Sequence, residues 1–326
     1  MTLPSVTRAP LRAGRDESGA SEIIRRLETQ VATVVRGKPE VIRQAVVCLL
    51  ARGHMLIEDV PGVGKTTLAQ ALARSLGLAF QRIQFTSDLL PSDILGISVF
   101  RQTQQEFEFI PGPIFSNVVL ADEINRTSPK TQSALLEAMS ERQVSVDRVR
   151  HSLPEPFVVI ATQNPLEYVG TFPLPESQLD RFMMSLRLGY PPREEEKILL
   201  LMGGVQDKLA KLEATVTRDE VLELQRSVER VRVADKIADY LLELARETRS
   251  SKEFLLGIST RAVQNFLRAA QAMALCEGRD CVVPDDLQRL AGPVLSHRVV
   301  LKGGATTLEG CREAVKGIVR RVAVPV

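Results

Sequence analysis

A glycine-bearing loop between an apolar segment and a helical segment constrains the fold of this chain more than any other feature. Residues 54–76 read HMLIEDVPGVGKTTLAQALARSL. The stretch from His54 to Glu58 predicts a short buried strand, and the stretch from Thr66 to Leu76 predicts a helix with leucines four residues apart on one face. A strand, a loop, Gly-Lys-Thr and a helix in this order indicate a phosphate-binding loop, or P-loop.

The residues of the loop suit a nucleoside triphosphate together with Mg²⁺. Glycines allow backbone N–H groups to turn toward a phosphate, and the N-terminus of the helix adds partial positive charge. We expect Lys65 to reach the β- and γ-phosphates and the Thr66 hydroxyl to bind Mg²⁺. Asp59 stands where the strict pattern has glycine. The predicted nucleotide-binding residues of the loop are Pro61, Gly62, Val63, Gly64, Lys65, Thr66 and Thr67.

Composition and charge narrow the class of protein. The chain has 326 residues, of which 44% are hydrophobic and 25% charged, and its net charge of +2 favours neither nucleic acid nor a membrane surface as a partner. No apolar run reaches a membrane-spanning length, and the first twenty residues lack the apolar core of a secretory signal. The four cysteines form no C-x-x-C pair, which argues against zinc and disulfides. These features predict a cytoplasmic protein without membrane insertion.

Strand and helix signals divide the chain into three parts. They alternate up to Pro191-Pro192, and beyond this break only helix signals occur. We therefore expect a disordered tail over residues 1–20, an α/β nucleotide-binding core over 21–191 and a helical lid over 192–326. Ser21 is expected to cap the first helix. Alternating apolar residues predict hairpins over 97–110 and 144–153.

Two acidic residues follow a second buried strand. Val118 to Ala121 is a continuous apolar run, typical of a parallel strand covered on both faces, and we expect it to be central in a parallel sheet. Asp122 and Glu123 come directly after it and are expected beside the P-loop. There Asp122 would hold Mg²⁺ through water, and Glu123 would take a proton from an attacking water or orient it.

With these motifs and with Asn164, Arg181 and Arg261 following in order, the sequence resembles the AAA+ ATPases and, more closely, the MoxR family. The resemblance covers about residues 34–262 and implies a P-loop NTPase core, with a parallel sheet flanked by helices, plus a C-terminal all-α lid. Asp59 is usual in this family. The segments that carry the resemblance are LIEDVPGVGKTTLA, QFTSDLLPSDILG, FEFIPGPIF, LADEINRTSPKTQSALLEAMSERQVSVD, VIATQNPLEYVGTFPLPESQLDRF and STRA.

The resemblance also implies roles for individual residues. Asn164 corresponds to sensor 1, which positions the lytic water, and Arg181 to an arginine finger that reaches the γ-phosphate of a neighbouring subunit. Arg261 corresponds to sensor 2, which reaches the nucleotide from the lid of the same subunit. The two hairpins resemble the family's helix-2 and pre-sensor-1 inserts. The residues that fall where the family cradles adenine are Val34, Val35 and Gly37.

The function implied by this resemblance is ATP hydrolysis by a chaperone-like machine. Such a protein binds ATP or ADP with Mg²⁺ and assembles into a ring, here expected to be a hexamer. It would remodel protein clients, often with a von Willebrand A-domain partner, during the maturation of metal or cofactor complexes.

Two alternatives remain open from the sequence alone. The first is a nucleic-acid motor, because helicase relatives share both hairpin inserts, although Arg148 and Arg150 at the tip of the second hairpin are a thin nucleic-acid footprint. The second is a nucleotide-gated scaffold that does not hydrolyse ATP. Such a scaffold would need none of Glu123, Asn164 and Arg181.

Overall fold

The computed structural model describes residues 16–103, 105–165, 170–201, 205–303 and 307–325, and its centre is a five-stranded sheet with the strand order β2-β5-β8-β1-β9. Every neighbouring pair in this sheet is parallel, which confirms the predicted fold class. The strands are β1 (Met55–Glu58), β2 (Phe80–Gln84), β5 (Val118–Asp122), β8 (Val158–Gln163) and β9 (Met184–Leu186). The predicted apolar strand, β5, is interior as expected, but the middle position belongs to β8.

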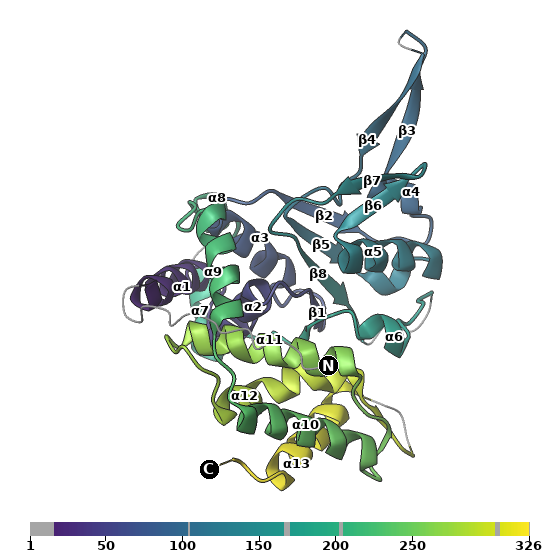
Figure 1. Ribbon diagram of the computed structural model, residues 1–326. Helices are drawn as coiled ribbons and strands as arrows, with labels where there is room; N and C mark the ends of the chain where they lie inside the picture. Colours follow the sequence, from purple (N-terminus) through teal and green to yellow (C-terminus); the bar gives the residue numbers. More distant parts are fainter. Residues whose placement is uncertain (1–15, 104, 166–169, 202–204, 304–306, 326) are drawn as a thin grey trace, which may run out of the picture.

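Helices cover both faces of this sheet (Figure 1). One face packs against α2 (Pro39–Leu50) and α3 (Lys65–Ser75), on which α1 (Asp16–Ala32) packs in turn, and the other face packs against α5 (Pro129–Glu141). Successive side chains of β1 alternate between the two layers, because Met55 and Ile57 join the first cluster and Leu56 the second. Coverage on both faces explains why these strands read as continuous apolar runs.

The N-terminal helix starts earlier than predicted. It begins at Asp16, so Ser21 lies inside α1 and does not cap it. The predicted tail over residues 1–20 therefore overlaps α1 in its last five residues, and residues 1–15 lie outside the described part of the chain.

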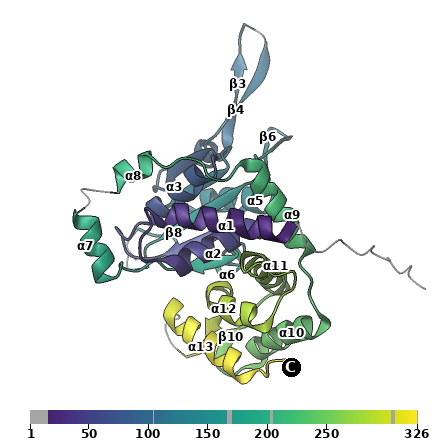
Figure 2. The same ribbon diagram turned by 90° about the vertical axis from the view of Figure 1, so that its left-hand side faces the viewer.

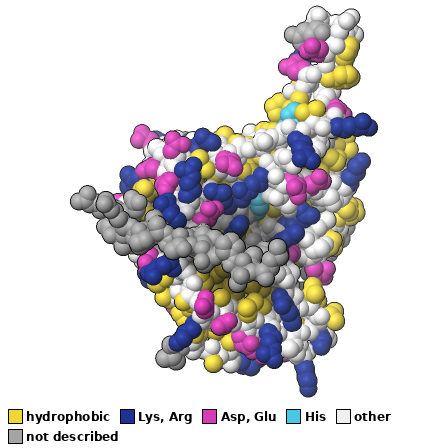
Figure 3. Space-filling view, in the orientation of Figure 1, with side chains coloured by type: hydrophobic (Ala, Val, Ile, Leu, Met, Phe, Trp, Pro, Cys, Tyr) yellow, Lys and Arg dark blue, Asp and Glu magenta, His cyan; other side chains and the backbone are white. Residues whose placement is uncertain are grey.

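Both predicted hairpins are present. Strand β3 (Gly96–Arg101) follows the short helix α4 (Pro91–Leu95) and pairs with β4 (Glu106–Pro111), while β6 (Gln143–Val146) pairs with β7 (Val149–Ser152). The β3–β4 hairpin stands away from the body of the protein as an arm (Figure 1). Apolar side chains gather along this arm (Figure 3), and the exposed ones are Ile97, Phe100, Phe107 and Ile110.

Residues beyond Pro192 form mainly helices, as predicted. These are α7 (Arg193–Leu201), α8 (Gln206–Ala210), α9 (Arg218–Arg230), α10 (Asp235–Ser250), α11 (Thr260–Cys276), α12 (Pro284–Leu295), the short 3-10 helix η2 (Ser296–Arg298) and α13 (Leu308–Arg321). A small antiparallel pair of strands, β10 (Phe254–Leu256) and β11 (Val300–Leu301), was not predicted.

The lid shares its hydrophobic core with the sheet domain. One cluster runs from α1, α2 and α3 through α9 into α10, α11, α12 and α13 without a break. Helix α9 packs on both α2 and α11, and α1 lies across this junction (Figure 2). We retain 21–191 and 192–326 as proposed domain boundaries, with α9 as the element that joins the two.

Candidate active site

The P-loop has the open conformation that a phosphate requires. Gly62 and Gly64 have φ angles of +84° and +97°, in the left-handed region that favours glycine. A Cβ atom at either position would meet no atom within 4 Å, so there is open space beside both glycines. Gly64 is the N-cap of α3, and the first N–H groups of this helix therefore face the loop. The residues present fit a bound phosphate.

Asp59 explains why this loop begins with an acid in place of glycine. Its side chain is buried, with an exposed fraction of 3%. The carboxylate accepts hydrogen bonds from the backbone N–H groups of Val60 (2.9 Å) and Gly189 (2.6 Å). Lys65 Nζ donates to the Asp59 carbonyl at 2.7 Å. Hydrogen bonds of Asp59 thus connect the start of the P-loop to the segment that follows β9.

The predicted magnesium ligand, Asp122, lies buried at the end of β5. Arg82 on the neighbouring strand β2 donates to Asp122 Oδ2 from Nε (3.0 Å) and Nη2 (2.6 Å). The Thr162 hydroxyl on β8 donates to Asp122 Oδ1 at 2.5 Å. The residues on either side of β5 therefore fix the orientation of this carboxylate. Sequence analysis missed Arg82 because nothing local marks a cross-strand contact.

Glu123 has an unusual backbone conformation, and its carboxylate is bound by two neighbouring side chains. Its φ of +58° is left-handed for a residue other than glycine, and its N–H donates to Thr162 Oγ1 at 2.9 Å. Its carboxylate accepts from Gln84 Nε2 at 2.9 Å and pairs with Arg126 of the 3-10 helix η1 (Ile124–Arg126) at 3.2 Å. To act on a water, this carboxylate has to exchange these protein partners.

A cleft of about 710 Å³ begins where β1 passes into the P-loop. Glu58, Asp59 and Val60 line its floor, and Asn164, the buried residue after β8, lies in its wall. Arg187 of the core and Glu309 of the lid also line the cleft and form an ion pair at 3.3 Å. This volume is in the range of sites that bind a nucleotide-sized molecule. The structure therefore brings Asn164 to the same cleft as the start of the P-loop.

A lid arginine that was not predicted from the sequence, Arg312, interacts electrostatically with Glu58, which lines this cleft. Burial raises the pKa of Glu58 at the end of β1, while a hydrogen bond from Gln163 and the positive charge of Arg312 oppose this shift. Arg312 belongs to α13 and donates from Nη2 to the Ser185 carbonyl at 3.2 Å. Burial lowers the pKa of Arg312, and its Nε has no hydrogen-bond partner among the described residues. Arg312 lies outside every recognised motif, which is why it was missed.

Arg181 follows the short helix α6 (Glu176–Leu179) and lies against α5 of its own chain. Its Nη1 donates to the Leu136 carbonyl at 2.9 Å and to Ser140 Oγ at 2.5 Å. It is not among the residues that line the cleft. The preceding residue, Asp180, accepts from Arg298 Nε and from Ser259 Oγ, both at 2.9 Å.

Arg298 ties the lid to the segment that carries Arg181. This residue of η2 is buried, with an exposed fraction of 3%, and it also donates to the carbonyls of Phe182 (2.5 Å) and Met183 (3.0 Å). Burial lowers its pKa to about 10, although Asp180 opposes the shift, and the charge of Arg261 lowers it further. Arg261 therefore lies near this network, two residues after Ser259, and like Arg181 it does not line the cleft.

The segment expected to cradle adenine lies against the same stretch as Asp59. Val34 and Val35 are buried, and Gly37 has a φ of +68°. A Cβ atom on Gly37 would approach Pro192 Cδ to 2.7 Å, and Lys38 Nζ donates to the Tyr190 carbonyl. Val34, Val35 and Gly37 do not line the cleft. Gly37 and Lys38 contact the stretch 189–192, and the first residue of this stretch, Gly189, donates a hydrogen bond to Asp59.

The described ranges also bear on membrane insertion and on metal binding. None of the helices there combines the length and the apolarity needed to cross a bilayer. The same ranges contain no group of three or more His, Cys, Asp or Glu side chains arranged to hold a metal ion.

Comparisons with known proteins agree with this geometry. Residues 54–184 match the model of the ATPase family associated with various cellular activities (AAA), and residues 246–316 match an AAA lid domain. The chain is 50% identical to uncharacterized protein YeaC of Bacillus subtilis, over 90% of this chain and 92% of that protein. It is 39% identical to chaperone MoxR1 of Mycobacterium tuberculosis, over 96% and 85%. A crystal structure from Cytophaga hutchinsonii, of a protein given as a candidate ATPase, superposes with a TM-score of 0.86 at 37% identity and covers 95% of this chain and 97% of that one.

Proposed function

Because this chain belongs to the MoxR family of AAA+ ATPases, we propose that it hydrolyses ATP in the cleft beside the P-loop in order to remodel protein clients. One observation carries the proposal. The adjacent strands β5, β8 and β1 end at one edge of the sheet with Asp122-Glu123, Asn164 and the P-loop respectively. A phosphate-binding loop, carboxylates and an amide therefore lie at one edge of the sheet, and these are the groups that phosphoryl transfer to water requires.

Binding of the nucleotide falls to the P-loop in this proposal. The backbone N–H groups around Gly62 and Gly64 would donate to phosphate oxygens, and Lys65 would leave the Asp59 carbonyl to reach the β- and γ-phosphates. Thr66 and Asp122 would hold Mg²⁺, which when bound neutralises developing phosphate charge. Asp122 is oriented for this role because Arg82 and Thr162 fix its carboxylate.

Activation of the attacking water falls to Glu123 and Asn164. Glu123 would accept a proton from the water, and Asn164 would orient it. The contacts of Glu123 with Gln84 and Arg126 hold its carboxylate before reaction. We infer that release from these two partners precedes each turnover.

Arg181 would complete the site of a neighbouring subunit. Its side chain donates to the Leu136 carbonyl and to Ser140 on α5 of its own chain, and to no residue of its own P-loop in the described structure, which supports a role on another molecule. A head-to-tail contact of this kind closes into a ring when its rotation permits, and we propose a hexamer. Sensor 2, Arg261, lies near Arg298 and Asp180 of the same network, and we propose that it also acts on the nucleotide.

The client and the compartment are proposed from the relatives. One relative is named a chaperone, which supports protein clients, and we propose a cytoplasmic protein that acts with a von Willebrand A-domain partner on metal or cofactor complexes. Over the face seen in Figure 3, Lys and Arg side chains are interspersed with Asp and Glu. On the part of that face that the grey atoms leave visible, Lys and Arg form no continuous basic field, which supports a protein client over a nucleic-acid one.

Phosphate release and ATP binding, measured on two variants, test the proposal. We expect Lys65→Ala to lose ATP binding, because Lys65 compensates phosphate charge in the ground state. We expect Glu123→Gln to bind ATP with unchanged affinity and to lose turnover by at least about a hundredfold. Glu137→Gln on the exposed face of α5 is the matched control and should behave as the parent protein. Equal loss of ATP affinity in the Lys65 and Glu123 variants would contradict the assigned roles.

The Glu123→Gln variant also tests the client class. Held in the ATP-bound form, it should retain client proteins in a pull-down that the Lys65→Ala variant does not retain. Retention of nucleic acid in place of protein would favour the motor alternative.

A further inference from the structure

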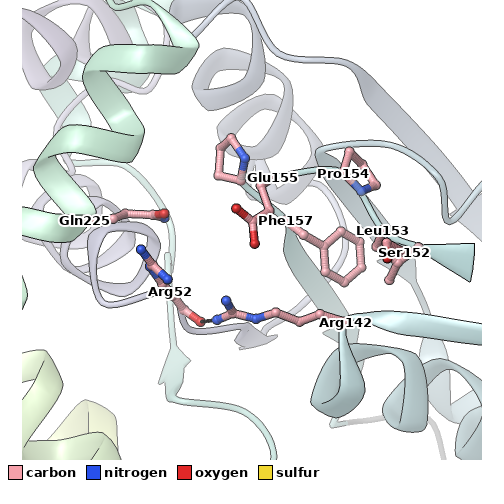
Figure 4. Close-up of a pocket in the computed structure, with 9 residues that line it drawn as sticks. Arg52, Arg142, Ser152, Leu153, Pro154, Glu155, Phe157 and Gln225 are labelled. Carbon is pink, nitrogen blue, oxygen red and sulfur yellow. Dashed lines mark hydrogen bonds between the residues drawn. The ribbon is translucent and has the colours of Figure 1, made fainter.

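A second pocket lies at the edge of the sheet opposite the P-loop. Its volume is about 130 Å³, and it is bounded by Arg52 before β1, Arg142 after α5, the segment 152–157 before β8, and Gln225 of α9 (Figure 4). We call it the arginine pocket. None of the motifs assigned to ATP hydrolysis contributes a residue to it, so its chemistry needs a separate explanation.

The guanidinium of Arg52 is poorly satisfied by the protein. Its Nε is buried and has no hydrogen-bond partner among the described residues. Its ion pair with Glu229 has an N–O distance of 3.9 Å, too long for a hydrogen bond. Buried donors of this kind are normally paired with protein groups or with a bound molecule. Arg52 therefore presents donors that an acceptor inside the pocket would satisfy.

Arg142 presents a second cation to the same space. Its Nη2 donates to the Arg52 carbonyl at 3.2 Å, which brings the two residues together (Figure 4). Burial lowers the pKa of Arg142, and the like charges of Arg52 and Arg268 lower it further, while Glu155 opposes the shift. An anion in the pocket would relieve this repulsion between cations.

The remaining wall supplies too little negative charge to compensate both cations. Glu155 is the single acid among the residues that line the pocket, and it forms no ion pair with Arg52 or Arg142 in the described structure. Its carboxylate points into the pocket from the wall opposite them (Figure 4). The buried apolar side chains of Leu153 and Phe157 close one side.

We propose that the arginine pocket binds one small tetrahedral oxyanion, with phosphate as its chemical type, between Arg52 and Arg142. Planar guanidinium groups donate paired hydrogen bonds to oxyanions, so two of them around one cavity form a matched site. A volume of about 130 Å³ accommodates one such group and excludes a whole nucleotide. The phosphate would be either a free ion or one carried on a side chain of a partner protein.

Occupation of the pocket would strengthen the junction of core and lid. Gln225 of α9 already donates to the Leu49 carbonyl at 2.8 Å, and Arg218 at the start of α9 donates to the Glu155 carbonyl. An anion between Arg52 and Arg142 would add contacts at this same junction. We therefore expect phosphate to raise the temperature of unfolding as well as to bind.

Calorimetric titration of the full chain with inorganic phosphate tests the proposal. A nonhydrolysable ATP analogue with Mg²⁺ is present in excess, so that the P-loop is filled and the arginine pocket remains. We expect saturable binding that Arg52→Met and Arg142→Met each weaken by at least about tenfold, since each removes a charge-assisted hydrogen-bond donor. Arg226→Met, which removes an exposed arginine from α9, is the control and should leave the affinity unchanged.

Glu155→Gln is expected to change the affinity for phosphate in the opposite direction, and a misfolded variant would not show such a gain. Removing the single acid of the wall should tighten phosphate binding by several-fold. A parallel titration with O-phosphoserine separates the two sources, because tighter binding of phosphoserine than of phosphate indicates a phosphorylated side chain and the reverse indicates a free ion. Either result supports the site.

The proposal is overturned if no saturable phosphate binding occurs, or if neither arginine variant changes it. Absence of binding by the ATP analogue would instead count against the proposed ATPase function. The phosphate titration is then repeated without the analogue and interpreted in the same way.

Discussion

Removal of the buried guanidinium of Arg298 should displace Arg181 and lower turnover while leaving the affinity for ATP unchanged. In Arg298→Met, Asp180 loses the hydrogen bond from Nε at 2.9 Å, and the Met183 carbonyl loses its bond from Nη1. The Phe182 carbonyl keeps a contact with His297 Nε2 at 3.0 Å. Among the lid residues that the structure describes, Ser259 is then the one that still donates to Asp180. The segment that carries Arg181 should therefore become free to move.

The expected size of the effect follows from the burial of this pair. Breaking a buried ion pair by removing one partner costs about 3–5 kcal/mol, and we take the lower end because the Asp180 side chain is 16% exposed. A loss of about 3 kcal/mol lowers the unfolding temperature by roughly 4 °C for a chain of this size. Misplacement of Arg181 should lower turnover by about ten- to a hundredfold, with the ATP dissociation constant unchanged.

Differential scanning calorimetry, ATP binding and phosphate release on the same preparations measure these effects. Arg321→Met, which breaks an exposed lid ion pair with Glu253, is the control and should cost less than about 1 kcal/mol and no turnover. Arg298→Lys should restore little turnover, because an ammonium lacks the fork that reaches Asp180 and the carbonyls together. If Arg298→Met lowers stability as expected while turnover per folded protein stays at the parent value, Arg298 does not position Arg181.

Three further predictions concern single positions. Burial lowers the pKa of His54 to about 4 from its usual 6.5, and its ring bonds to Val159 N–H and the Met139 carbonyl. The unfolded chain therefore binds a proton that the native one excludes between these values, and stability should fall by up to about 3 kcal/mol as pH drops from 6.5 to 4. In acid titrations of unfolding His54→Gln should flatten this slope, and an identical slope would exclude His54 as the cause. Gln84→Ala removes one hydrogen-bond donor to the Glu123 carboxylate, so the rate of ATP hydrolysis without a client should rise by up to about tenfold at constant ATP affinity. An unchanged rate would mean that this contact does not restrain Glu123. Gly37→Ala places a Cβ at 2.7 Å from Pro192 Cδ with a φ of +68° and should cost about 2 kcal/mol in urea unfolding, while a neutral result would show that the backbone shifts to accept it.

Local patterns in the sequence were sufficient for most of the elements. The continuous apolar run ending at Asp122 predicted a strand covered on both faces, and alternating residues predicted the hairpins at 97–110 and 144–153. Strand order was beyond such patterns, because β8 lies between β5 and β1 through pairings of residues far apart in the chain. The two short strands β10 and β11 have two or three residues each, too few for a periodic signal.

Where a motif carried a candidate site residue, its position in the fold could be predicted. The P-loop, Asp122, Glu123 and Asn164 stand in recognisable segments, and the structure brings them to one edge of the sheet. Arg82 and Arg298 act through tertiary contacts, with Asp122 on the next strand and Asp180 in another domain, and nothing beside them in the sequence marks these partners. The binding and catalytic roles of all these residues, and those of Arg181 and Arg261, remain predictions.

A shared active site is the central claim, and mixing two inactive variants tests it most directly. Arg181→Ala keeps an intact P-loop and Lys65→Ala keeps an intact Arg181, so a mixed ring contains some complete sites. The measurement is the ATPase rate against mixing ratio, under conditions in which a fluorescent label confirms that subunits exchange. We predict that activity absent from either variant alone appears in the mixture and peaks at an intermediate ratio. Confirmed exchange with no activity at any ratio, or full activity of the parent protein as a monomer, would contradict the account.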